Sequence, residues 1–228
     1  MGFVWTDEKV RYMRAAAEQT AYYKEVAALI AEGLTGREHV CVAGCGLGDL
    51  AAALAPCAAQ VTAVDVSARA LAALKEKQIG NVSVRCGDIE ALPPEQPYDV
   101  MAFCHFGTME EILRIAARQC SGTVFLCKRL ESESAFSRGK HDANHGFSYA
   151  CEFLRARNIP FTGGVLETEF GQPFVSREDA ARFFALYGYD AQTQLEETGN
   201  HAYPLYLPRV RRAGWLRFSA SDIKENLV

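Results

Sequence analysis

The stretch Val40-Cys41-Val42-Ala43-Gly44-Cys45-Gly46-Leu47-Gly48-Asp49-Leu50 decides how this chain folds. An apolar run with strand character ends in Gly-x-Gly-x-Gly, and an alanine- and leucine-rich helical segment follows at once. Glycines in such a turn let the backbone approach a ligand closely, because no Cβ stands in the way. The first N–H groups of the following helix have no partner inside the helix and point at that ligand. We therefore predict a strand, a turn and a helix that bind a mononucleotide-like cofactor.

Further strands and helices alternate downstream of this stretch. Short apolar segments that we predict as strands span residues 60–65, 82–86, 98–104 and 123–128, after a first strand at 40–43. Helices are predicted between them, one capped by Ser67 and one opened by a capping box from Thr108 to Glu111. Repeated strand–helix–strand units predict a parallel sheet covered on both faces, and crossover rules make it an open, doubly wound α/β fold.

The two ends of the chain complete the predicted architecture. Thr6, followed by two acidic residues, predicts a helix that runs to about Leu34. Residues 131–146 are polar and predict a surface loop. We predict a helix at about 148–157, a strand near 166–170 and a helix from Ser176 to Gly188. Residues 191–198 and about 205–219 are predicted to add two antiparallel strands at one edge of the sheet.

Composition restricts the classes of function. The 228 residues are 49% hydrophobic and 23% charged, as expected for one soluble α/β domain. A net charge of −4 disfavours a nucleic-acid partner, and the arginines at 209, 211, 212 and 217 are expected on a solvated face. No secretory signal or membrane-spanning run is recognised. Five of the eight cysteines lie in or beside predicted buried strands, so a reduced, cytoplasmic location is expected.

The spacing of the glycines distinguishes between cofactors. A dinucleotide site reads Gly-x-Gly-x-x-Gly, but here the third glycine comes one residue early, at Gly48, which disfavours a dehydrogenase. Asp65 ends the second predicted strand and can accept hydrogen bonds from ribose hydroxyls. Asp88 follows the third strand and suits an adenine amino group. Because Gly44, Asp65, Asp88 and Cys104 all lie at strand carboxyl ends, one crevice can gather them.

These residues resemble the successive motifs of the class I S-adenosylmethionine-dependent methyltransferases. The resemblance covers residues 38–130 by motif and the whole chain by element order. It implies a Rossmann-like, doubly wound sheet of seven strands, mostly parallel with an antiparallel C-terminal edge hairpin, and an N-terminal lid helix. We therefore expect a single domain over 1–228, divided into a helical lid (1–36), a cofactor-binding core (38–130), an insertion at the acceptor pocket (131–175), and a C-terminal helix with edge strands (176–228).

The same resemblance implies S-adenosylmethionine as cofactor and S-adenosylhomocysteine as product. It implies that Gly44 to Gly48 wrap the methionine part, that Asp65 binds the ribose, and that Asp88 and Ile89 flank the adenine. The predicted cofactor-binding residues are Ala43, Gly44, Cys45, Gly46, Gly48, Asp65, Val66, Gly87, Asp88, Ile89 and Cys104.

One position departs from the family pattern. The family usually has an acidic residue two positions before the first glycine, and this chain has Val42 there. That carboxylate helps to organise the loop and the cationic amino group of the cofactor. The departure keeps open a non-catalytic protein that binds the cofactor, beside the alternative of a nucleotide-using dehydrogenase.

The acceptor is expected to be a small molecule. Methyl transfer from a sulfonium is an in-line displacement in which the protein mainly positions the acceptor and excludes water. His105, with an unperturbed pKa near ~6.5, is predicted either to act as a base or to orient the acceptor, against the alternative that its ring merely packs at the rim. The predicted substrate-binding residues are Tyr22, Tyr23, Phe106, Arg138 and His141.

Two absences from the sequence restrict the acceptor and the metal content. The fourth strand is not followed by the Asn/Asp-Pro-Pro-aromatic motif used for methylation of amide or adenine nitrogens, which also disfavours a nucleic-acid substrate. His141 and His145 lie four residues apart, but in a predicted loop and without a third ligand, so no metal is expected.

Overall fold

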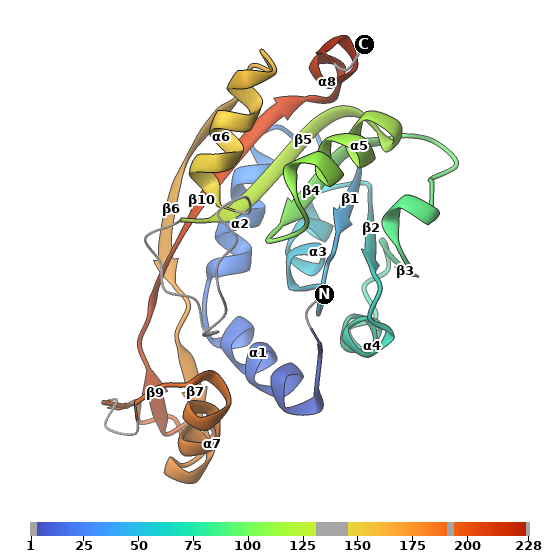
Figure 1. Cartoon of the computed structure of the whole chain (residues 1–228). Helices are drawn as coiled ribbons and strands as arrows, with labels where there is room; N and C mark the ends of the chain where they lie inside the picture. The colour runs from blue at the N-terminus through green and yellow to red at the C-terminus, as the bar shows by residue number, and fades with distance from the viewer. Residues whose placement is uncertain (1–3, 131–145, 191–193, 227–228) are drawn as a thin grey trace.

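A seven-stranded sheet forms the centre of the computed structural model, which describes residues 4–130, 146–190 and 194–226 (Figure 1). The strand order is β3-β2-β1-β4-β5-β10-β6. The first five strands are parallel, and β10 runs antiparallel to both of its neighbours. The bounds are β1 (His39–Ala43), β2 (Gln60–Asp65), β3 (Val82–Cys86), β4 (Tyr98–Cys104), β5 (Cys120–Arg129), β6 (Thr162–Glu169) and β10 (Val210–Ser219).

This order confirms the predicted Rossmann-like fold and places its ligand-binding edge. The chain winds from β1 outward to β2 and β3, then returns to β4 and β5 on the other side. A ligand crevice in such a sheet opens beyond the carboxyl ends of the strands at that switch point, between β1 and β4. The five parallel strands all occur within three residues of their predicted bounds.

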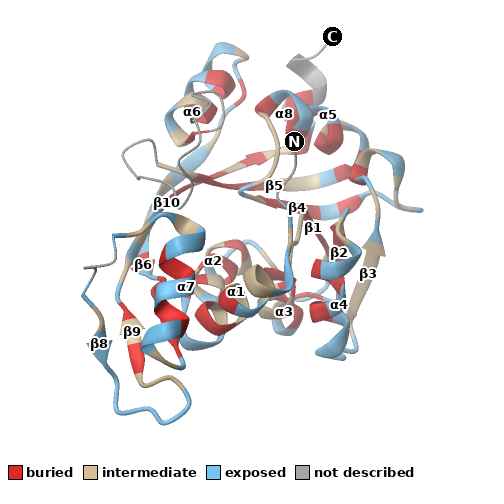
Figure 2. Ribbon diagram, turned by 60° about the horizontal axis from the view of Figure 1, so that its bottom comes forward, coloured by how far each residue is buried: buried red, intermediate tan, exposed pale blue. Residues whose placement is uncertain are grey.

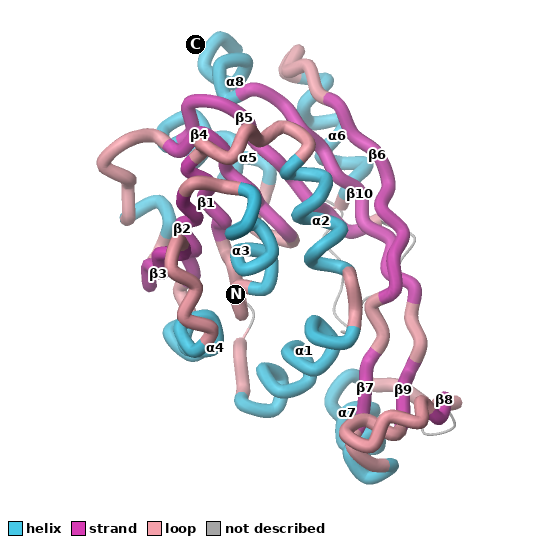
Figure 3. Tube along the Cα trace, turned by 180° about the vertical axis from the view of Figure 1, so that it is seen from behind, coloured by secondary structure: helices cyan, strands magenta, loops and turns pink. Residues whose placement is uncertain are grey.

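Helices cover both faces of the sheet. One face carries α2 (Tyr22–Ala31), α3 (Asp49–Leu54) and α4 (Ala68–Glu76), and the 3-10 turn η1 (Ala55–Cys57) follows α3. The other face carries α5 (Met109–Gln119), α6 (Phe147–Ala156) and α8 (Ala220–Asn226). Seen from behind in Figure 3, α2 and α3 lie in front of the strands. Figure 2 shows the buried residues on the strands and on the helix sides that face them.

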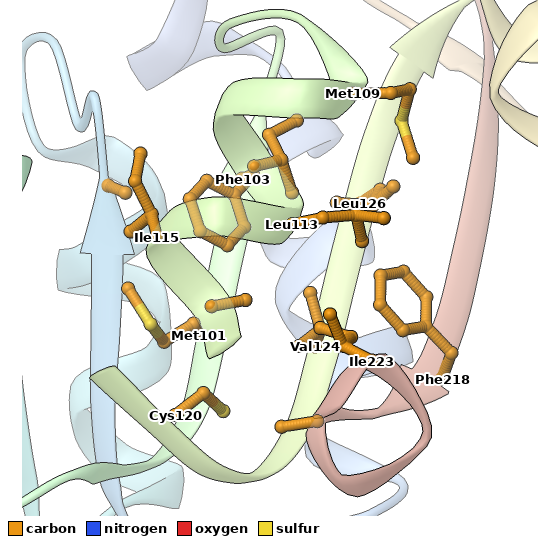
Figure 4. Packing of buried hydrophobic residues seen from close by; sticks show 14 of the residues in the cluster. Met101, Phe103, Met109, Leu113, Ile115, Cys120, Val124, Leu126, Phe218 and Ile223 are labelled. Carbon is orange, nitrogen blue, oxygen red and sulfur yellow. The ribbon is translucent and has the colours of Figure 1, made fainter. Parts of the chain in front are cut away.

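The core beneath α5 shows why these segments fold as they do. Met101 and Phe103 of β4 and Leu126 of β5 point toward Leu113 of α5, and Phe218 of β10 joins them (Figure 4). The predicted capping box starts α5, since the Thr108 side chain accepts from the backbone N–H three residues on and Glu111 bonds back. Local capping and the apolar face of the helix therefore agree on where α5 begins and which side it buries.

The N-terminal segment differs from its prediction as one long helix. Thr6 caps α1 (Asp7–Gln19) as predicted, but α1 ends there and α2 starts afresh at Tyr22. Thr20 has extended backbone, and its hydroxyl donates to the carbonyl of Ala16 at 2.8 Å. A threonine hydroxyl that competes for a helix carbonyl favours a break, and it lets α1 turn away from α2. Figures 1 and 3 show α1 lying across one end of the molecule instead of continuing α2.

The predicted edge pair of strands is wrong in its partners. Instead of pairing with residues 191–198, β10 pairs with β5 on one side and with β6 on the other, so β6 forms the edge. Consecutive residues Ala213 and Gly214 are both buried, which requires cover on both faces of β10. Residues 191–193 lie outside the described part of the chain. The strands β8 (Glu196–Glu197) and β9 (Leu205–Leu207) join β7 (Gln172–Phe174) in a separate small sheet.

The small sheet packs with α7 (Arg177–Tyr187) and α1 around a group of aromatic rings. Tyr12 meets Phe183 edge-on at 4.9 Å between ring centroids, and Phe174 meets the same ring at 5.3 Å. The predicted start of α7 is confirmed, because Ser176 accepts from the backbone N–H of Asp179 at 3.2 Å. α1 is thus held between this small unit and the main sheet.

The cysteines and the helices give two further findings. All eight cysteines are free, although Cys86 is exposed and not buried as its strand position suggested. Within the described ranges, none of the helices combines the length and the apolar character that crossing a lipid bilayer requires.

Asp179 is the polar group that ties α7 to α1. Its side chain is 1% exposed and accepts from Arg11 at 2.7 Å, and the Tyr12 hydroxyl donates to its backbone carbonyl at 2.9 Å. Burial opposes ionisation of this carboxyl, but the hydrogen bonds from Arg11 and from the Val175 N–H outweigh burial and lower its pKa. The ionised form is therefore the one that stabilises the fold.

Replacing Asp179 by asparagine should lower the free energy of unfolding by about 2 kcal/mol at pH 7, because a charge-assisted bond inside the protein is lost. Since the folded pKa is depressed, this contribution is present above the unfolded pKa of about 3.9 and disappears as the pH falls through the folded pKa. Urea titrations from pH 7 down to about pH 2 should therefore show a constant difference between the two proteins above about pH 5, and convergence as the pH falls below about 4. A constant difference at all pH values would contradict the ionic role. The matched control is Glu76→Gln, which breaks the exposed pair with Arg14 and should cost under about 0.5 kcal/mol.

Candidate functional site

A cavity of about 560 Å³ opens at the carboxyl ends of β1, β2, β3 and β4. Four loops line it, one after each strand, and α1, α2 and β10 close its other sides. The predicted cofactor-binding residues that line the cavity are Gly44, Cys45, Gly46, Asp65, Val66, Gly87, Asp88, Ile89 and Cys104. Two further predicted residues, Ala43 and Gly48, do not line it. The sequence motifs therefore converge on one space, as the strand-end argument anticipates.

Glycines in the loop after β1 allow it to bend and to be covered closely. Gly44 and Gly46 have φ angles of +65° and +55°, in the left-handed region that favours glycine. A Cβ on Gly44 would lie 2.3 Å from the Phe106 ring, so an aromatic side chain packs directly on the loop. Gly48 has a different task, because a Cβ there would meet Leu74 of α4 at 2.5 Å. Gly48 thus lets α3 and α4 pack together and does not face the ligand.

Asp65 joins the end of β2 to this loop. Its Oδ2 accepts from the Gly46 N–H and its Oδ1 accepts from the Ser67 N–H, both at 2.8 Å. The Cys45 N–H donates to the carbonyl of Val64 at 3.0 Å, which adds a backbone link between the same two segments. A carboxylate has about four lone-pair sites, so each oxygen still has capacity for a ligand hydroxyl. Asp65 is therefore fixed in place and remains able to accept hydrogen bonds from a ribose.

The loop after β3 forms the next wall. Asp88 caps the 3-10 turn η2 (Ile89–Ala91) by accepting from the Glu90 N–H at 3.0 Å, and the carboxylate is exposed. Ile89 is 4% exposed and anchors the turn in the core. On the rim, Val66 keeps 72% of its side-chain surface exposed although it is apolar. An apolar side chain suits the flat face of an adenine ring, and a hydrogen-bond acceptor beside it suits the amino group at the edge of that ring.

Val42 stands where the resembled family has its carboxylate. Its side chain is 1% exposed and lies in an apolar cluster with Val26 and Leu50, at the wall of the cavity. An unpaired carboxylate at this position would be costly to bury. The acidic side chains among the described lining residues are Asp65 and Asp88, and both lie at the β2–β3 end of the cavity.

His105 occupies the β4 end of the cavity with a φ of +54°. Its Nε2 lies 2.8 Å from the Tyr22 hydroxyl and 2.8 Å from Nη2 of Arg211. A guanidinium can only donate, so Nε2 must be an acceptor and the ring proton sits on Nδ1. Although the ring is open to the cavity, the surrounding protein lowers its pKa by desolvation, and the positive charge of Arg211 lowers it further. The geometry therefore favours a neutral imidazole.

Two cysteines lie behind His105 on neighbouring strands. Cys104 and Cys127 are paired in register on β4 and β5. A hydrogen bond between their thiols raises the pKa of Cys104 and lowers that of Cys127, and Cys127 also lies 3.5 Å from the Tyr22 hydroxyl. The ligand atoms of Cys104, His105 and Cys127 lie within 4.8 Å of one another, and zinc takes such a donor set. The guanidinium bonded to His105 opposes a second cation there. His141 and His145, the pair considered for a metal, lie outside the described residues.

Arg211 is the site residue that the sequence argument missed. The sequence predicts the arginines at 209, 211, 212 and 217 together on a solvated face, but Arg209 precedes β10, and β10 places Arg211 and Arg212 on opposite faces. Arg211 lines the cavity and lies over the rings of Tyr22 and Phe170, at 4.5 and 5.0 Å from their centroids. Arg212 points to the opposite face and pairs with Glu167 at 3.0 Å. The period-two alternation of a strand is the signal that separates these two neighbours.

Two of the five residues predicted to bind the substrate line the cavity. Tyr23 and Phe106 line the cavity. Tyr22 is 0% exposed and lies behind the wall, where its hydroxyl holds His105. Arg138 and His141 fall outside the described residues. The aromatic side chains of Trp5, Tyr23 and Phe106 contribute to the apolar lining of the cavity, together with aliphatic side chains such as Val42.

Comparison with known proteins agrees with this geometry. Residues 40–122 match a family model described as a methyltransferase domain. No curated protein sequence matches the chain.

Solved structures share the fold. A putative methyltransferase from Bacillus halodurans C-125 has 15% identity and a TM-score of 0.52 over 86% of this chain and 98% of its own. A magnesium protoporphyrin IX methyltransferase from Synechocystis PCC 6803, solved with bound S-adenosylmethionine, has 18% identity and a TM-score of 0.50, covering 94% and 86%. A putative RNA methyltransferase from Pyrococcus horikoshii has 16% identity and a TM-score of 0.51, covering 87% and 82%. At these identities the likeness establishes the fold and leaves the acceptor open.

The neutral state of His105 gives a measurable expectation. Its imidazole should titrate below the ordinary value of about 6.5 in NMR spectra, with the resonance assigned by its loss in His105→Gln. Arg211→Met should raise the titration midpoint, because the repelling cation is removed and the lone pair on Nε2 is freed. Arg212→Met, which alters the neighbouring arginine on the other face of β10, should leave the midpoint unchanged. An unmoved midpoint in Arg211→Met would show that the guanidinium does not control this ring.

Proposed function

We propose that the chain is a class I S-adenosylmethionine-dependent methyltransferase that transfers the cofactor's methyl group to a small-molecule acceptor, a proposal that the methyltransferase-domain match over residues 40–122 and the shared fold support. The observation that carries this proposal is the convergence of four strand-end loops on one cavity, with the Asp65 carboxylate fixed at its wall. The cavity volume lies within the ~300–1,000 Å³ typical of small-molecule sites.

The residues present fit the cofactor. We propose that Asp65 accepts the ribose hydroxyls, that Asp88 and Ile89 flank the adenine, and that the positive-φ glycines of the β1 loop lie against the methionine part. When bound, S-adenosylmethionine supplies a methyl group already activated by its sulfonium. The chain's own residues then have to bind the cofactor, orient the acceptor and exclude water. These tasks depend more on the shape of the cavity than on reactive side chains.

His105 fits an orienting role better than that of a base. Its Nε2 has one lone pair, which the Arg211 donor occupies beside the Tyr22 hydroxyl, so this nitrogen is not free to take a proton from a substrate. The neutral ring carries its N–H on Nδ1, and we propose that this N–H faces the ligand. An N–H donor can hold an acceptor oxygen or nitrogen in line with the methyl group. We therefore propose that His105 positions the acceptor, and that the nucleophile reacts without proton transfer to this imidazole.

Three observations support a small acceptor. Aromatic side chains from the segment before α1, from α2 and from the loop after β4 narrow the cavity, which suits a ligand that enters it whole. The chain has a net charge of −4, against the basic surface that nucleic acids require. The residues after β4 are Cys104-His105-Phe106-Gly107, which lack the motif used for amide or adenine nitrogens.

Val42 supports one competing function, that of a protein that binds the cofactor without turnover. The missing carboxylate removes a partner for the cofactor's amino group. Release of S-adenosylhomocysteine from S-adenosylmethionine across a panel of hydroxyl, thiol and amine acceptors distinguishes the two. Turnover with any acceptor excludes the non-catalytic alternative, whereas intact binding without turnover across the panel supports it.

Binding of the product should depend on Asp65. Calorimetry should detect binding of S-adenosylhomocysteine to the wild type. Asp65→Ala should lower the affinity by at least about ten-fold, because charge-assisted hydrogen bonds to the ribose are lost. Melting curves should confirm that the variant is folded.

The matched control is Glu90→Gln, since Glu90 lies next to Asp88 but pairs with Arg114 outside the cavity. This variant should bind as the wild type does. No detectable binding by the wild type at millimolar ligand, or a stronger response to NAD(H), would refute the assignment.

A further inference from the structure

Arg211 is a positively charged residue at the cavity, and it has no acidic partner among the described residues. Its Nη2 donates a hydrogen bond to Nε2 of His105, and its guanidinium lies over the rings of Tyr22 and Phe170. None of the ion pairs between described side chains includes Arg211, whereas Arg212 and Arg217 each have a glutamate. A guanidinium has five N–H donors, so most of its capacity is unused.

The surroundings of Arg211 add positive charge. Lys128 of β5 lies beneath the same loop and donates to the carbonyls of Phe106 and Gly107 at 2.7 and 2.8 Å. Burial lowers the pKa of Lys128 to about 8, so it remains mostly protonated at pH 7. Two negative groups, the Cys127 thiolate and the Glu111 carboxylate, face Lys128 and raise its pKa against the effect of burial. The groups that most raise the pKa of Arg211 are Tyr22, Tyr23, Cys104 and Cys127, and none of them is a carboxylate. His105 is neutral, so Arg211 faces no carboxylate counter-ion among the described residues.

Charge is therefore separated along the cavity. Asp65 and Asp88 lie at the β2–β3 end, where they accept hydrogen bonds, and Arg211 lies at the β4–β10 end, where it donates them. A ligand that fills the cavity must offer donors at the first end and an acceptor at the second. Adenosine hydroxyl and amino groups suit the first end, and an anion suits the second.

We propose that Arg211 binds a carboxylate of the ligand that fills this end of the cavity. The planar fork of a guanidinium matches a carboxylate in a bidentate pair, and the rings of Tyr22 and Phe170 hold its plane in place. The hydrogen bond to His105 uses one N–H of the Arg211 guanidinium and orients the remaining N–H groups. The inference rests on the proposed function, since it deepens the same site. The carboxylate comes from the acceptor or from the amino-acid part of the cofactor, and these sources are separable.

The first arm tests the cofactor as the source. Calorimetry compares S-adenosylhomocysteine with its decarboxylated analogue, 5′-deoxy-5′-(3-aminopropylthio)adenosine, on the wild type and on Arg211→Met. If the cofactor's carboxylate binds Arg211, the wild type prefers S-adenosylhomocysteine by at least about ten-fold. Arg211→Met then lowers this preference below three-fold, because it weakens the binding of S-adenosylhomocysteine and leaves the binding of the decarboxylated analogue unchanged.

The second arm tests the acceptor as the source. Protein saturated with S-adenosylhomocysteine is titrated by NMR with benzoate, phenylacetate and hexanoate, each against its neutral amide. If the acceptor's carboxylate binds Arg211, at least one acid binds about ten-fold tighter than its amide, and Arg211→Met abolishes the difference. Arg211→Lys should retain part of the preference for the acid, because lysine keeps the positive charge but lacks the planar guanidinium fork. Arg212→Met, altered on the opposite face of β10, should behave as the wild type.

The outcomes separate the two proposals. A carboxylate preference that depends on Arg211 in either arm supports the inference and names the source. If Arg211→Met changes the preference by less than two-fold in both arms, the inference is wrong, although the proposed function stands. If the wild type fails to bind S-adenosylhomocysteine, the proposed function fails. The acid and amide titrations on ligand-free protein then still test the carboxylate site by itself.

Discussion

The two hydrogen bonds that the Asp65 carboxylate accepts hold the ligand-binding edge of this protein together. One comes from the loop after β1 and the other from the turn after β2, so one side chain fixes both strand ends relative to each other. The loop can reach Asp65 because Gly44 and Gly46 adopt positive φ angles. The parallel pairing of β1 with β2 sets the register on which this contact depends. A ligand therefore meets a carboxylate that is already oriented.

A second constraint acts at the other end of the cavity. His105, Tyr22 and Arg211 come from the loop after β4, from α2 and from β10, and they meet through short hydrogen bonds and a cation–π contact. This contact links the N-terminal helices, the parallel sheet and the antiparallel strand. The two ends differ in charge, with carboxylates at one and a guanidinium at the other, and together they define which groups a bound ligand has to offer. Val42, buried between them, adds no charge of its own.

Much of the fold was predictable because it is encoded locally. The strands β1 to β5 are short apolar runs, and capping residues such as Ser67 and Thr108 mark the helices between them. The break at Thr20 is local, since the Thr20 hydroxyl competes for the Ala16 carbonyl, but one threonine in a helical pattern is a weak signal. The other errors arose where distant segments decide, as in the pairing of β10 with β6, which depends on tertiary packing that no local pattern records. Arg211 was missed for the same reason, since its face depends on the register of β10 between two strands far away in the sequence.

We propose that the strand-end cavity binds an adenosyl cofactor through Asp65 and the glycine loop. A crystal structure of the protein with S-adenosylhomocysteine tests this binding mode most directly. We expect ribose hydroxyls within hydrogen-bonding distance of the Asp65 carboxylate, adenine beside Asp88, and the amino-acid part toward His105. The product bound elsewhere on the surface, or a cavity still empty at saturating S-adenosylhomocysteine, would contradict it.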